Sequence, residues 1–461
     1  MSNPIKVAVI GAGISGLACA YRLQQSGVDV ALLEASDRPG GLMGSVEKDG
    51  VLFESGPQSF QGTETLLELI RELGIAGELQ RADARAPRYV FLHGHLRKIP
   101  MSPQALLASS LLKPGSRWKI ASEAFKRSKP PSEEETVASF VRRKFGHEIL
   151  EYLVAPFVSG VYAGDPEQLS LKAAFPSLDE WEREYGSVLR GAMKARPAKG
   201  KGGGSPPLCS FRHGVATLPS ALAGKLGERL QTGTCVLDIQ RSVGAGAATG
   251  SYAIRALRQG QEQHASVNAV VIATPAYAAG ALLASVSAHV AQVLGGVPYA
   301  PVAVVAANYY RQQVSDSLQG FGFLVPRGQK VRTLGTVWNS SLFPGRAREG
   351  TVAMTSFIGG ATDIEIVQHS EEEIARIVQD ENAHILGITG PPIATAVWAY
   401  PRALPQYNLG HGHIVEAIRD AERQTPGLFF AGNYLEGPAI GKCVENGFHT
   451  ADAVTRYLQS R

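Results

Sequence analysis

The distribution of apolar and polar residues near the N-terminus predicts a strand, a helix and a second strand in succession. The run from Lys6 to Ile10 is almost entirely apolar, as expected of a buried strand. The segment from Leu17 to Gly27 has helical character and ends in a glycine suited to a helix C-cap. Val28 to Leu33 is typical of a second strand. A secretory signal peptide is the alternative, because residues 18–20 form an A-x-A triplet, but the apolar stretch belongs to a larger βαβ unit.

Three glycines between the first strand and the helix indicate a dinucleotide site. Gly11, Gly13 and Gly16 have the G-x-G-x-x-G spacing, and Glu34 closes the second strand. In such a unit the first glycine permits a tight turn, the second lets backbone approach the pyrophosphate, and the third packs the helix on the strand. The pyrophosphate lies at the helix N-terminus, and the acid accepts hydrogen bonds from ribose hydroxyls.

Segments at both ends of the chain favour FAD as the dinucleotide. Arg38 with Gly40 and Gly41 follows the ribose acid closely, so a loop can fold back over the flavin end, with Arg38 available to phosphate oxygens. An ordinary turn is the alternative for this sequence. Near the C-terminus, residues 426–433 form a strand that ends in a glycine turn, and residues 440–447 open a last helix. That helix can return a second N-terminus to the cofactor.

The middle of the chain is mostly helical. Residues 89–97 predict a hairpin, and residues 102–195 predict helices interrupted by prolines. A glycine-rich spacer follows at 198–207. Residues 244–250 are glycine-rich, but their spacing predicts a hairpin loop and no second nucleotide site. Residues 265–310 lack charged side chains, yet proline and glycine break them into strand, buried helix and strand, so no transmembrane helix is predicted.

Composition narrows the picture only a little. The 461 residues allow two or three domains, and 44% hydrophobic with 19% charged residues is ordinary for a globular protein. A net charge of +4 is too small to indicate a nucleic-acid partner. The four cysteines are far apart and form no C-x-x-C pair, which predicts neither a disulfide framework nor a metal site and fits a reducing compartment.

Several longer stretches carry a family resemblance. The chain resembles the protoporphyrinogen oxidases of the flavin amine oxidase superfamily from end to end. Besides the N-terminal unit, the resemblance rests on RPGG (38–41), SGPQSF (55–60), SGVYAGDPEQLSLKAAFP (159–176), GFGFLVP (320–326), TSFIGG (355–360), LPQYNLGH (404–411) and LFFAGNYLEGPAIGKCVENG (428–447). One departure is visible. The family usually has Gly-Gly where this chain has His213-Gly214.

The resemblance implies an α/β fold. Its parts are a discontinuous Rossmann-like FAD-binding domain, a mixed-sheet substrate domain and a helical membrane-binding insertion. The expected boundaries place the FAD-binding domain at 1–88, 208–275 and 424–461, the helical insertion at 89–207 and the substrate domain at 276–423.

The resemblance also implies the site residues. The expected substrate-binding residues are Arg88, which would pair with a propionate, Gly160, whose backbone would face the pyrrole nitrogens, and Leu324 and Phe357, which would sandwich a ring. A surface arginine and a core phenylalanine are the respective alternatives for Arg88 and Phe357. Val236 is expected to meet adenine through its main chain. The full set of expected cofactor-binding residues is Gly11, Gly13, Ile14, Ser15, Gly16, Glu34, Ala35, Arg38, Gly40, Gly41, Leu42, Gly56, Pro57, Gln58, Ser59, Val236, Ala273, Thr274, Trp398, Gly432, Asn433, Pro438, Ala439 and Ile440.

The activity implied is FAD-dependent, six-electron oxidation of protoporphyrinogen IX to protoporphyrin IX in heme biosynthesis. With no NAD(P) loop and no dithiol in the sequence, dioxygen or a quinone is the expected acceptor, and dioxygen is preferred. No side chain is expected to act as a general base, and His213 and His411 are expected to be structural. The alternatives are a coproporphyrinogen III oxidase, an oxidase of amines or carotenoids, and a prenyl-protein-binding chaperone of the same fold, which would need no flavin.

A basic cluster suggests a membrane surface as partner. Six cations between 113 and 129 surround apolar residues, namely Lys113, Arg117, Lys119, Lys126, Arg127 and Lys129 beside 105–107, 111–112, Trp118, Ile120 and Phe125. A solvated basic helix is the alternative, but the resemblance favours docking of a cytoplasmic protein on the inner membrane surface. Further partners that the resemblance suggests are ferrochelatase and a second copy of the chain.

Overall fold

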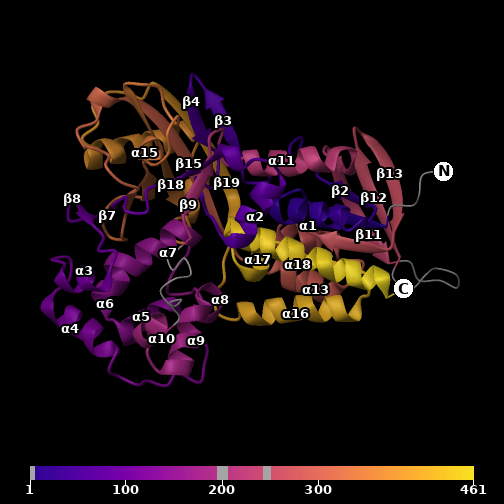
Figure 1. The fold of residues 1–461 in the computed structure, drawn as a ribbon, viewed down its shortest axis with the longest axis horizontal. Helices are drawn as coiled ribbons and strands as arrows, with labels where there is room; N and C mark the ends of the chain where they lie inside the picture. The colour runs from indigo at the N-terminus through magenta and orange to yellow at the C-terminus, as the bar shows by residue number, and fades with distance from the viewer. Residues whose placement is uncertain (1–5, 195–205, 242–250, 461) are drawn as a thin grey trace.

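A five-stranded parallel sheet organises one half of the molecule. The computed structural model describes residues 6–194, 206–241 and 251–460. In this sheet the strand order is β10 (Leu230–Gln231), β2 (Val30–Leu33), β1 (Val7–Ile10), β14 (Ala269–Ile272) and β20 (Leu428–Phe430). The first and last parts of the chain thus share one sheet, as Figure 1 shows by the indigo and yellow segments lying together. The predicted βαβ unit and the return of the C-terminus are confirmed.

Two layers cover this sheet. On one face α1 (Ile14–Gln25) packs on α18 (Ile440–Gln459), with α2 (Glu64–Glu72) and α11 (Thr217–Leu226) beside them. The other face carries the antiparallel sheet β11 (Thr234–Arg241), β12 (Tyr252–Arg258) and β13 (Gln261–Val267), together with α12 (Ala276–Leu282), α13 (Ala288–Gly295) and α16 (His411–Gln424). The expected substrate segment began at 276, but α12 and α13 bury their apolar residues against the FAD-binding sheet. The predicted loop at 244–250 lies outside the described residues.

A seven-stranded mixed sheet forms the second half. Its order is β19 (Ala394–Pro405), β15 (Tyr299–Tyr310), β18 (Thr351–Gly359), β17 (Thr333–Val337), β16 (Gly322–Leu324), β7 (Arg88–Leu92) and β8 (His95–Lys98). Only β16 and β7 pair in parallel. The hairpin predicted at 89–97 is confirmed as β7–β8. The expected boundaries place this hairpin in the helical insertion, but its pairing with β16 makes it the edge of the seven-stranded sheet. α15 (Glu371–Leu386) packs on this sheet.

Between the two sheets lie the hairpin β3 (Ser45–Lys48)–β4 (Val51–Glu54) and a small sheet of β5 (Phe60–Gln61), β9 (Leu208–Phe211) and β6 (Leu79–Arg81). Two short helices, α14 (Asn339–Leu342) and α17 (Asn433–Glu436), complete this region. These segments join the FAD-binding and substrate halves, and several of them carry expected site residues.

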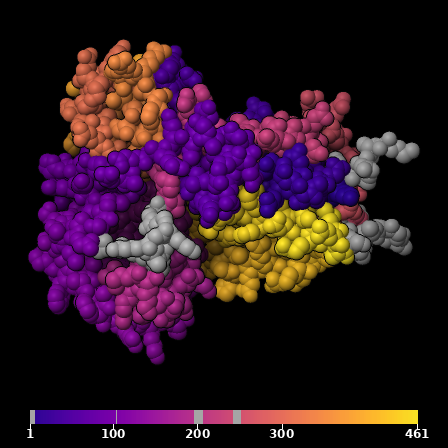
Figure 2. Space-filling view, viewed as in Figure 1, coloured from indigo at the N-terminus to yellow at the C-terminus, as the bar shows by residue number. Residues whose placement is uncertain are grey.

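Helices follow the β7–β8 hairpin and form a separate lobe, seen as the magenta and purple mass of Figure 2. They are α3 (Pro103–Ala108), α4 (Pro114–Glu123), α5 (Val137–Lys144), α6 (His147–Ile149), a π-helix (Leu150–Val154), α7 (Ala155–Tyr162), α8 (Leu171–Ala174), α9 (Pro176–Tyr185) and α10 (Val188–Lys194). The helical pattern predicted from 102 onward is confirmed. Most of the predicted spacer at 198–207 lies outside the described residues. Among the helices that the structure describes, none is both long enough and apolar enough to cross a membrane.

Candidate functional site

The glycine loop between β1 and α1 is built so that one of its three glycines faces open space. Gly11 has φ +102°, and a Cβ there would lie 2.8 Å from the Ala273 carbonyl oxygen. A Cβ on Gly16 would lie 1.9 Å from the Gly11 carbonyl oxygen, so close packing of α1 requires glycine at both positions. A Cβ on Gly13 would meet no described heavy atom within 4 Å. Gly13 is also the N-cap of α1 and provides no side-chain cap, so within the described part of the chain the first-turn N–H groups of Ile14 and Ser15 have no capping side chain.

Glu34 lies beside this loop, at the end of β2. Its carboxylate accepts hydrogen bonds from the backbone N–H groups of Ala12 (2.7 Å) and Ser36 (2.9 Å), which fixes its position. The Glu34 carbonyl accepts from Thr234 N (2.8 Å), so the start of β11, with Val236, lies next to the acid. The expected cofactor-binding residues Glu34, Ala35 and Val236 are therefore brought together.

The turn at 38–44 closes over the loop. Gly40 N donates to the Ala12 carbonyl (2.8 Å), and a Cβ on Gly41 would lie 3.5 Å from Gly13 Cα. A Cβ on Gly56 would lie 2.1 Å from the Leu42 carbonyl oxygen, which places the 55–59 segment directly against this turn. Arg38 donates to the carbonyls of Gly41 (2.9 Å) and Met43 (3.3 Å). Its guanidinium therefore holds the turn, while Arg38 remains exposed, and its expected contact with phosphate oxygens stays a prediction.

The C-terminal segment brings a second helix N-terminus to the same region. Gly432 N donates to Asn446 Oδ1 (3.0 Å), and a Cβ on Gly447 would lie 2.5 Å from the Ser15 carbonyl oxygen, so α18 lies directly against α1. The N-cap of α18, Ala439, has no side-chain cap. Pro438 and Ile440 flank it, and Asn433 follows Gly432 in the turn after β20.

These residues fit a dinucleotide. The uncapped N-terminus of α1 provides N–H donors for a pyrophosphate, and the space above Gly13 lets it approach the backbone. The buried hydroxyl of Thr274, after β14, has no hydrogen-bond partner among the described residues, as expected of a group that meets a ligand.

One row of residues crosses the whole substrate sheet on a single face. Directly paired residues of neighbouring strands point to the same side. From one edge to the other, successive pairing gives Arg97, Val90, Leu324, Gly335, Phe357, Val304 and Trp398. Leu324 and Phe357 flank Gly335, and a Cβ on Gly335 would lie 2.9 Å from Leu324 Cδ2, so the Leu324 side chain lies over this glycine. The row thus unites two expected substrate residues with Trp398, which was expected to contact the cofactor.

Helix α7 covers the Leu324 end of this row. A Cβ on Gly160 would lie 2.6 Å from Leu324 Cδ2, so the helix backbone approaches the sheet as closely as glycine allows. The C-terminal end of α7 is fastened by three donors. Gln406 Nε2 donates to Tyr162 O (2.9 Å), Ala361 N to Ala163 O (2.7 Å) and Arg327 Nη2 to Gly164 O (3.3 Å).

Arg88 is on β7, the strand next to Leu324. It comes two residues before Val90, the partner of Leu324, and therefore lies on the same face of the sheet. It is exposed, its guanidinium lies 5.2 Å from the centre of the Phe321 ring, and Nη1 is 4.0 Å from Met101 Sδ. No carboxylate among the described residues pairs with it. Arg97 is exposed on the same face of the hairpin. The place of Gly335 in this row could not be predicted from the sequence, because it follows from strand pairing between distant segments.

The two histidines expected to be structural lie outside this row. His411 is buried, Nε2 is 2.9 Å from the Tyr434 carbonyl oxygen, and burial lowers its pKa, which favours the neutral ring. His213 is exposed and lies 3.8 Å from a Glu78 carboxylate oxygen.

Comparison with known proteins gives the family. The profile of the flavin containing amine oxidoreductases matches residues 14–455. The chain belongs to this family. Its cofactor is accordingly a flavin, and the dinucleotide unit described above makes that flavin FAD. The protein is thus an FAD-dependent oxidoreductase of the flavin containing amine oxidoreductase family.

Its relatives include porphyrinogen oxidases. The chain is 37% identical to the chloroplastic protoporphyrinogen oxidase of Oryza sativa subsp. japonica over 480 residues, covering 98% of this chain and 88% of the relative. It is 26% identical to the coproporphyrinogen III oxidase of Bacillus subtilis, covering 98% of both. Among solved structures, a putative protoporphyrinogen oxidase from Exiguobacterium sp. 255-15 superimposes with a TM-score of 0.83 at 23% identity over the full length of both chains, which confirms the fold.

Proposed function

We propose that this protein oxidises protoporphyrinogen IX to protoporphyrin IX in heme biosynthesis, with dioxygen as the electron acceptor. The observation that carries the proposal is the row from Arg97 to Trp398, which α7 covers at Leu324 and beside which Arg88 lies on the same face of β7. The similarity of the chain to plant protoporphyrinogen oxidases supports the same substrate.

The row matches the chemistry of the substrate. A porphyrinogen is a large apolar macrocycle, and protoporphyrinogen IX carries its two propionates on one side. Leu324 and Phe357 would accept the apolar rings, and Arg88 would pair with a propionate through a bidentate guanidinium contact. FAD, when bound, supplies the two-electron acceptor, so three successive oxidations remove six electrons and six protons. Reoxidation by dioxygen balances each two-electron step with one hydrogen peroxide.

The protein's part is binding and orientation. Gly160 lets the α7 backbone approach Leu324, and the three donors on its last carbonyls keep the helix against the sheet. A macrocycle held in this way has one face on the row and little freedom to rotate, which lowers the barrier by orientation. No titratable side chain occupies the central part of the row, from Val90 to Trp398, so we assign no general base.

Coproporphyrinogen III is the second candidate substrate. It has propionates on all four rings and therefore needs cations at both ends of the row. A surface groove of about 570 Å³ beside Trp398 is lined by Lys48 and Arg376, but Arg376 belongs to α15, which packs on the face of the sheet opposite the row. Glu371 and Glu372 line the same groove and would offset these charges, so the two-propionate substrate is favoured.

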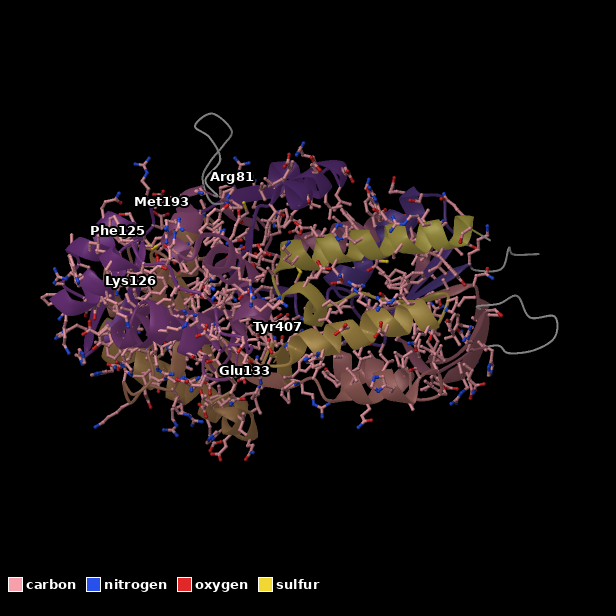
Figure 3. The ribbon with its side chains drawn as sticks, turned by 90° about the horizontal axis from the view of Figure 1, so that it is seen from below. Arg81, Phe125, Lys126, Glu133, Met193 and Tyr407 are labelled. Atoms are coloured by element: carbon pink, nitrogen blue, oxygen red, sulfur yellow. The ribbon has the colours of Figure 1, made fainter. Side chains whose placement is uncertain are left out.

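We also propose that the helical lobe docks on an anionic membrane surface. Trp118 and Phe125 are 76% and 87% exposed, and Figure 3 shows Phe125, Lys126 and Met193 at the end of the molecule away from the termini. Leu112 and Ile120, which the sequence placed beside the basic cluster as docking residues, are instead buried in the core of the lobe. Lys119 Nζ donates a hydrogen bond to the Arg142 carbonyl within the lobe (2.8 Å), so this cation of the basic cluster already has a partner. The docking surface is therefore smaller than expected.

The reductive half-reaction tests the proposed function. Protoporphyrinogen IX or coproporphyrinogen III is added anaerobically to the FAD-loaded protein, and bleaching of the oxidised flavin band is followed. We expect both to bleach the flavin, protoporphyrinogen IX at lower concentration. Bleaching by an amine, and by neither porphyrinogen, would contradict the proposal.

A further inference from the structure

A fully buried ion pair links the two halves of the molecule next to the cofactor site. Arg346 and Glu54 are at most 1% exposed, and Arg346 Nη1 lies 2.6 Å from Glu54 Oε1. Arg346 lies between α14 and β18 of the substrate half. Glu54 ends β4 and directly precedes the segment 55–59, of which residues 56–59 are expected to bind the cofactor.

Both partners bind further segments. Glu54 also accepts from Ser45 Oγ and from Val215 N (3.0 Å), whereas Arg346 also donates to Ser210 Oγ and to the Phe211 carbonyl (3.3 Å). Three stretches that are remote in sequence therefore meet at one pair. Burial raises the pKa of the Glu54 carboxyl, while the guanidinium and the other donors act against this shift.

Gly214 is part of the same arrangement. Its φ is +89°, and a Cβ there would lie 2.2 Å from Ser45 Oγ and 3.0 Å from Glu54 Oε1. Where the family usually has two glycines, this chain keeps only Gly214. A side chain at this position would collide with Ser45 and Glu54, so the arrangement around the ion pair requires this glycine.

The segment after Glu54 is held by two more side chains of the substrate half. Tyr400 Oη donates to the Ser55 carbonyl (3.0 Å), and Asn339 Nδ2 donates to Gln58 Oε1 (2.6 Å). Arg346, Tyr400 and Asn339 thus fasten residues 54–58 to the substrate sheet and its adjoining loops. These contacts join the two halves of the molecule at this point.

Stability alone gives little reason for such a pair. Desolvation of two charges offsets most of their attraction, and well-packed apolar replacements are often neutral or stabilising. We propose that Glu54 and Arg346 are a positioning pair, which holds the flavin-binding segment 55–59 in one fixed position against the substrate half.

The test compares folding with flavin binding. The variants are Arg346→Met, Glu54→Gln and the double variant, and the control is Arg348→Met, which removes an exposed arginine two residues further on. For each FAD-loaded protein, the dissociation constant for FAD is measured by dilution and flavin fluorescence, together with Tm and the visible flavin spectrum. No substrate is present, so this test can fail independently of the proposed function.

We expect each single variant to lower Tm, because it leaves a buried group without its partner. The double variant should regain most of the lost Tm. Its dissociation constant for FAD should nevertheless be at least about tenfold higher than that of the unaltered protein, and its flavin spectrum should be shifted. Arg348→Met should have the same Tm, FAD affinity and flavin spectrum as the unaltered protein. A double variant with unaltered FAD affinity and spectrum would overturn the proposal.

Arg346→Lys keeps the test decisive if the double variant does not fold. Lysine retains the charge facing Glu54 but lacks the planar fork that also reaches Ser210 and Phe211. We expect a folded protein with FAD affinity reduced about threefold or more. Unaltered FAD affinity in this variant would also overturn the proposal.

Discussion

Gly160 and Leu324 are in contact across the boundary between the helical lobe and the substrate sheet. The Cβ that Gly160 lacks would lie 2.6 Å from Leu324 Cδ2. Residues 164 positions apart therefore meet because one of them has no side chain. This contact sets the distance between α7 and the row that we propose binds the macrocycle.

Gly160→Ala should therefore impair substrate binding. The new methyl group would displace Leu324 or lift α7, and we expect kcat/KM for protoporphyrinogen IX to fall about tenfold or more, with FAD content unchanged. Gly160→Ala combined with Leu324→Ala should recover part of the loss, because the overlap is removed. Gly115→Ala is the control, since its Cβ meets no described heavy atom within 4 Å. Wild-type kinetics in Gly160→Ala would show that α7 does not border the bound substrate.

Arg88→Ala should raise KM for protoporphyrinogen IX and leave FAD content and Tm unchanged. A charge-assisted hydrogen bond contributes about 1.5–3 kcal/mol, so kcat/KM should fall roughly 10- to 150-fold. Arg88→Lys should restore only part of the activity. Arg97→Ala should also raise KM, because Arg97 is on the same face, whereas Lys98→Ala on the opposite face should not. Equal kinetics in Arg88→Ala and the unaltered protein would remove the proposed anchor.

Membrane docking should depend on the two exposed aromatic residues of the helical lobe. Replacing Trp118 and Phe125 by serine should weaken sedimentation with anionic vesicles about tenfold or more, since each exposed ring loses apolar surface to bury. Salt above about 0.15 M should weaken binding of the unaltered protein. Ile364→Ser, which removes an exposed apolar side chain (61%) from the substrate half, is the control. Equal binding to neutral and anionic vesicles would argue against a role for the basic residues.

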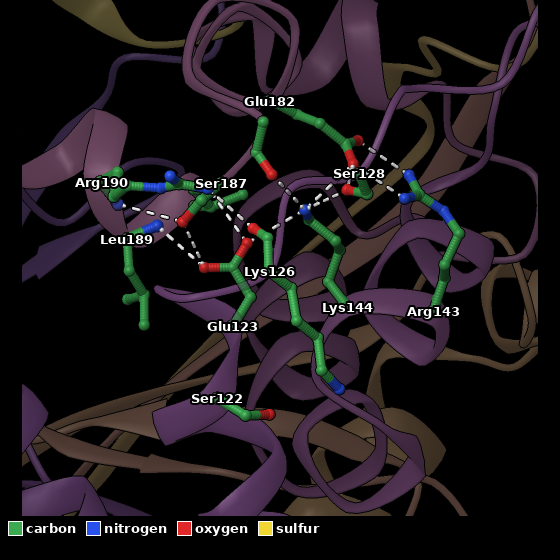
Figure 4. Close-up of polar contacts among 12 residues, drawn as sticks. Ser122, Glu123, Lys126, Ser128, Arg143, Lys144, Glu182, Ser187, Leu189 and Arg190 are labelled. Atoms are coloured by element: carbon green, nitrogen blue, oxygen red, sulfur yellow. Dashed lines mark hydrogen bonds and ion pairs between the residues drawn. The ribbon is translucent and has the colours of Figure 1, made fainter.

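The helical lobe should be acid-sensitive because of a buried charge network (Figure 4). Burial would raise the pKa of Glu182, but hydrogen bonds from Arg143, Ser128 and Lys144 lower it to about 2. A lowered carboxyl pKa contributes stability above its ordinary value of 4.5, which is lost as pH falls from there to about 2. The contribution at neutral pH is about 3 kcal/mol.

Urea unfolding at several pH values measures this effect. Glu182→Gln should be less stable at pH 7 and lose less stability than the unaltered protein between pH 5 and about 2. Glu184→Gln, a change at an exposed neighbour, should behave like the unaltered protein. Parallel pH profiles for the Glu182→Gln variant and the unaltered protein would contradict the assignment.

The parts of the site predicted correctly from sequence are those encoded locally. The spacing of Gly11, Gly13 and Gly16 between two strands predicted the loop, because turn, close approach and packing are requirements of neighbouring residues. The row across the substrate sheet could not be predicted in this way. It depends on β7 pairing with β16, and no local pattern at Arg97 or Gly335 signals that partnership.

Which apolar residues of the helical lobe are buried could not be predicted from the sequence either. Ile120 and Trp118 are both apolar and two residues apart on α4, yet one is 4% and the other 76% exposed. Which side of a short helix faces the core depends on helices packed from elsewhere in the chain. Arg346 gave no signal either, because a lone arginine in a loop does not indicate a buried partner 292 residues away.

The most direct test is aerobic turnover of the two porphyrinogens side by side. Purified FAD-loaded protein is mixed with protoporphyrinogen IX or coproporphyrinogen III, and the product spectrum and dioxygen uptake are recorded together. We predict formation of protoporphyrin IX, with three molecules of dioxygen consumed per molecule of product. We also predict that kcat/KM for coproporphyrinogen III is at least about tenfold lower than kcat/KM for protoporphyrinogen IX. FAD-loaded protein that left both porphyrinogens unoxidised in air would contradict the account.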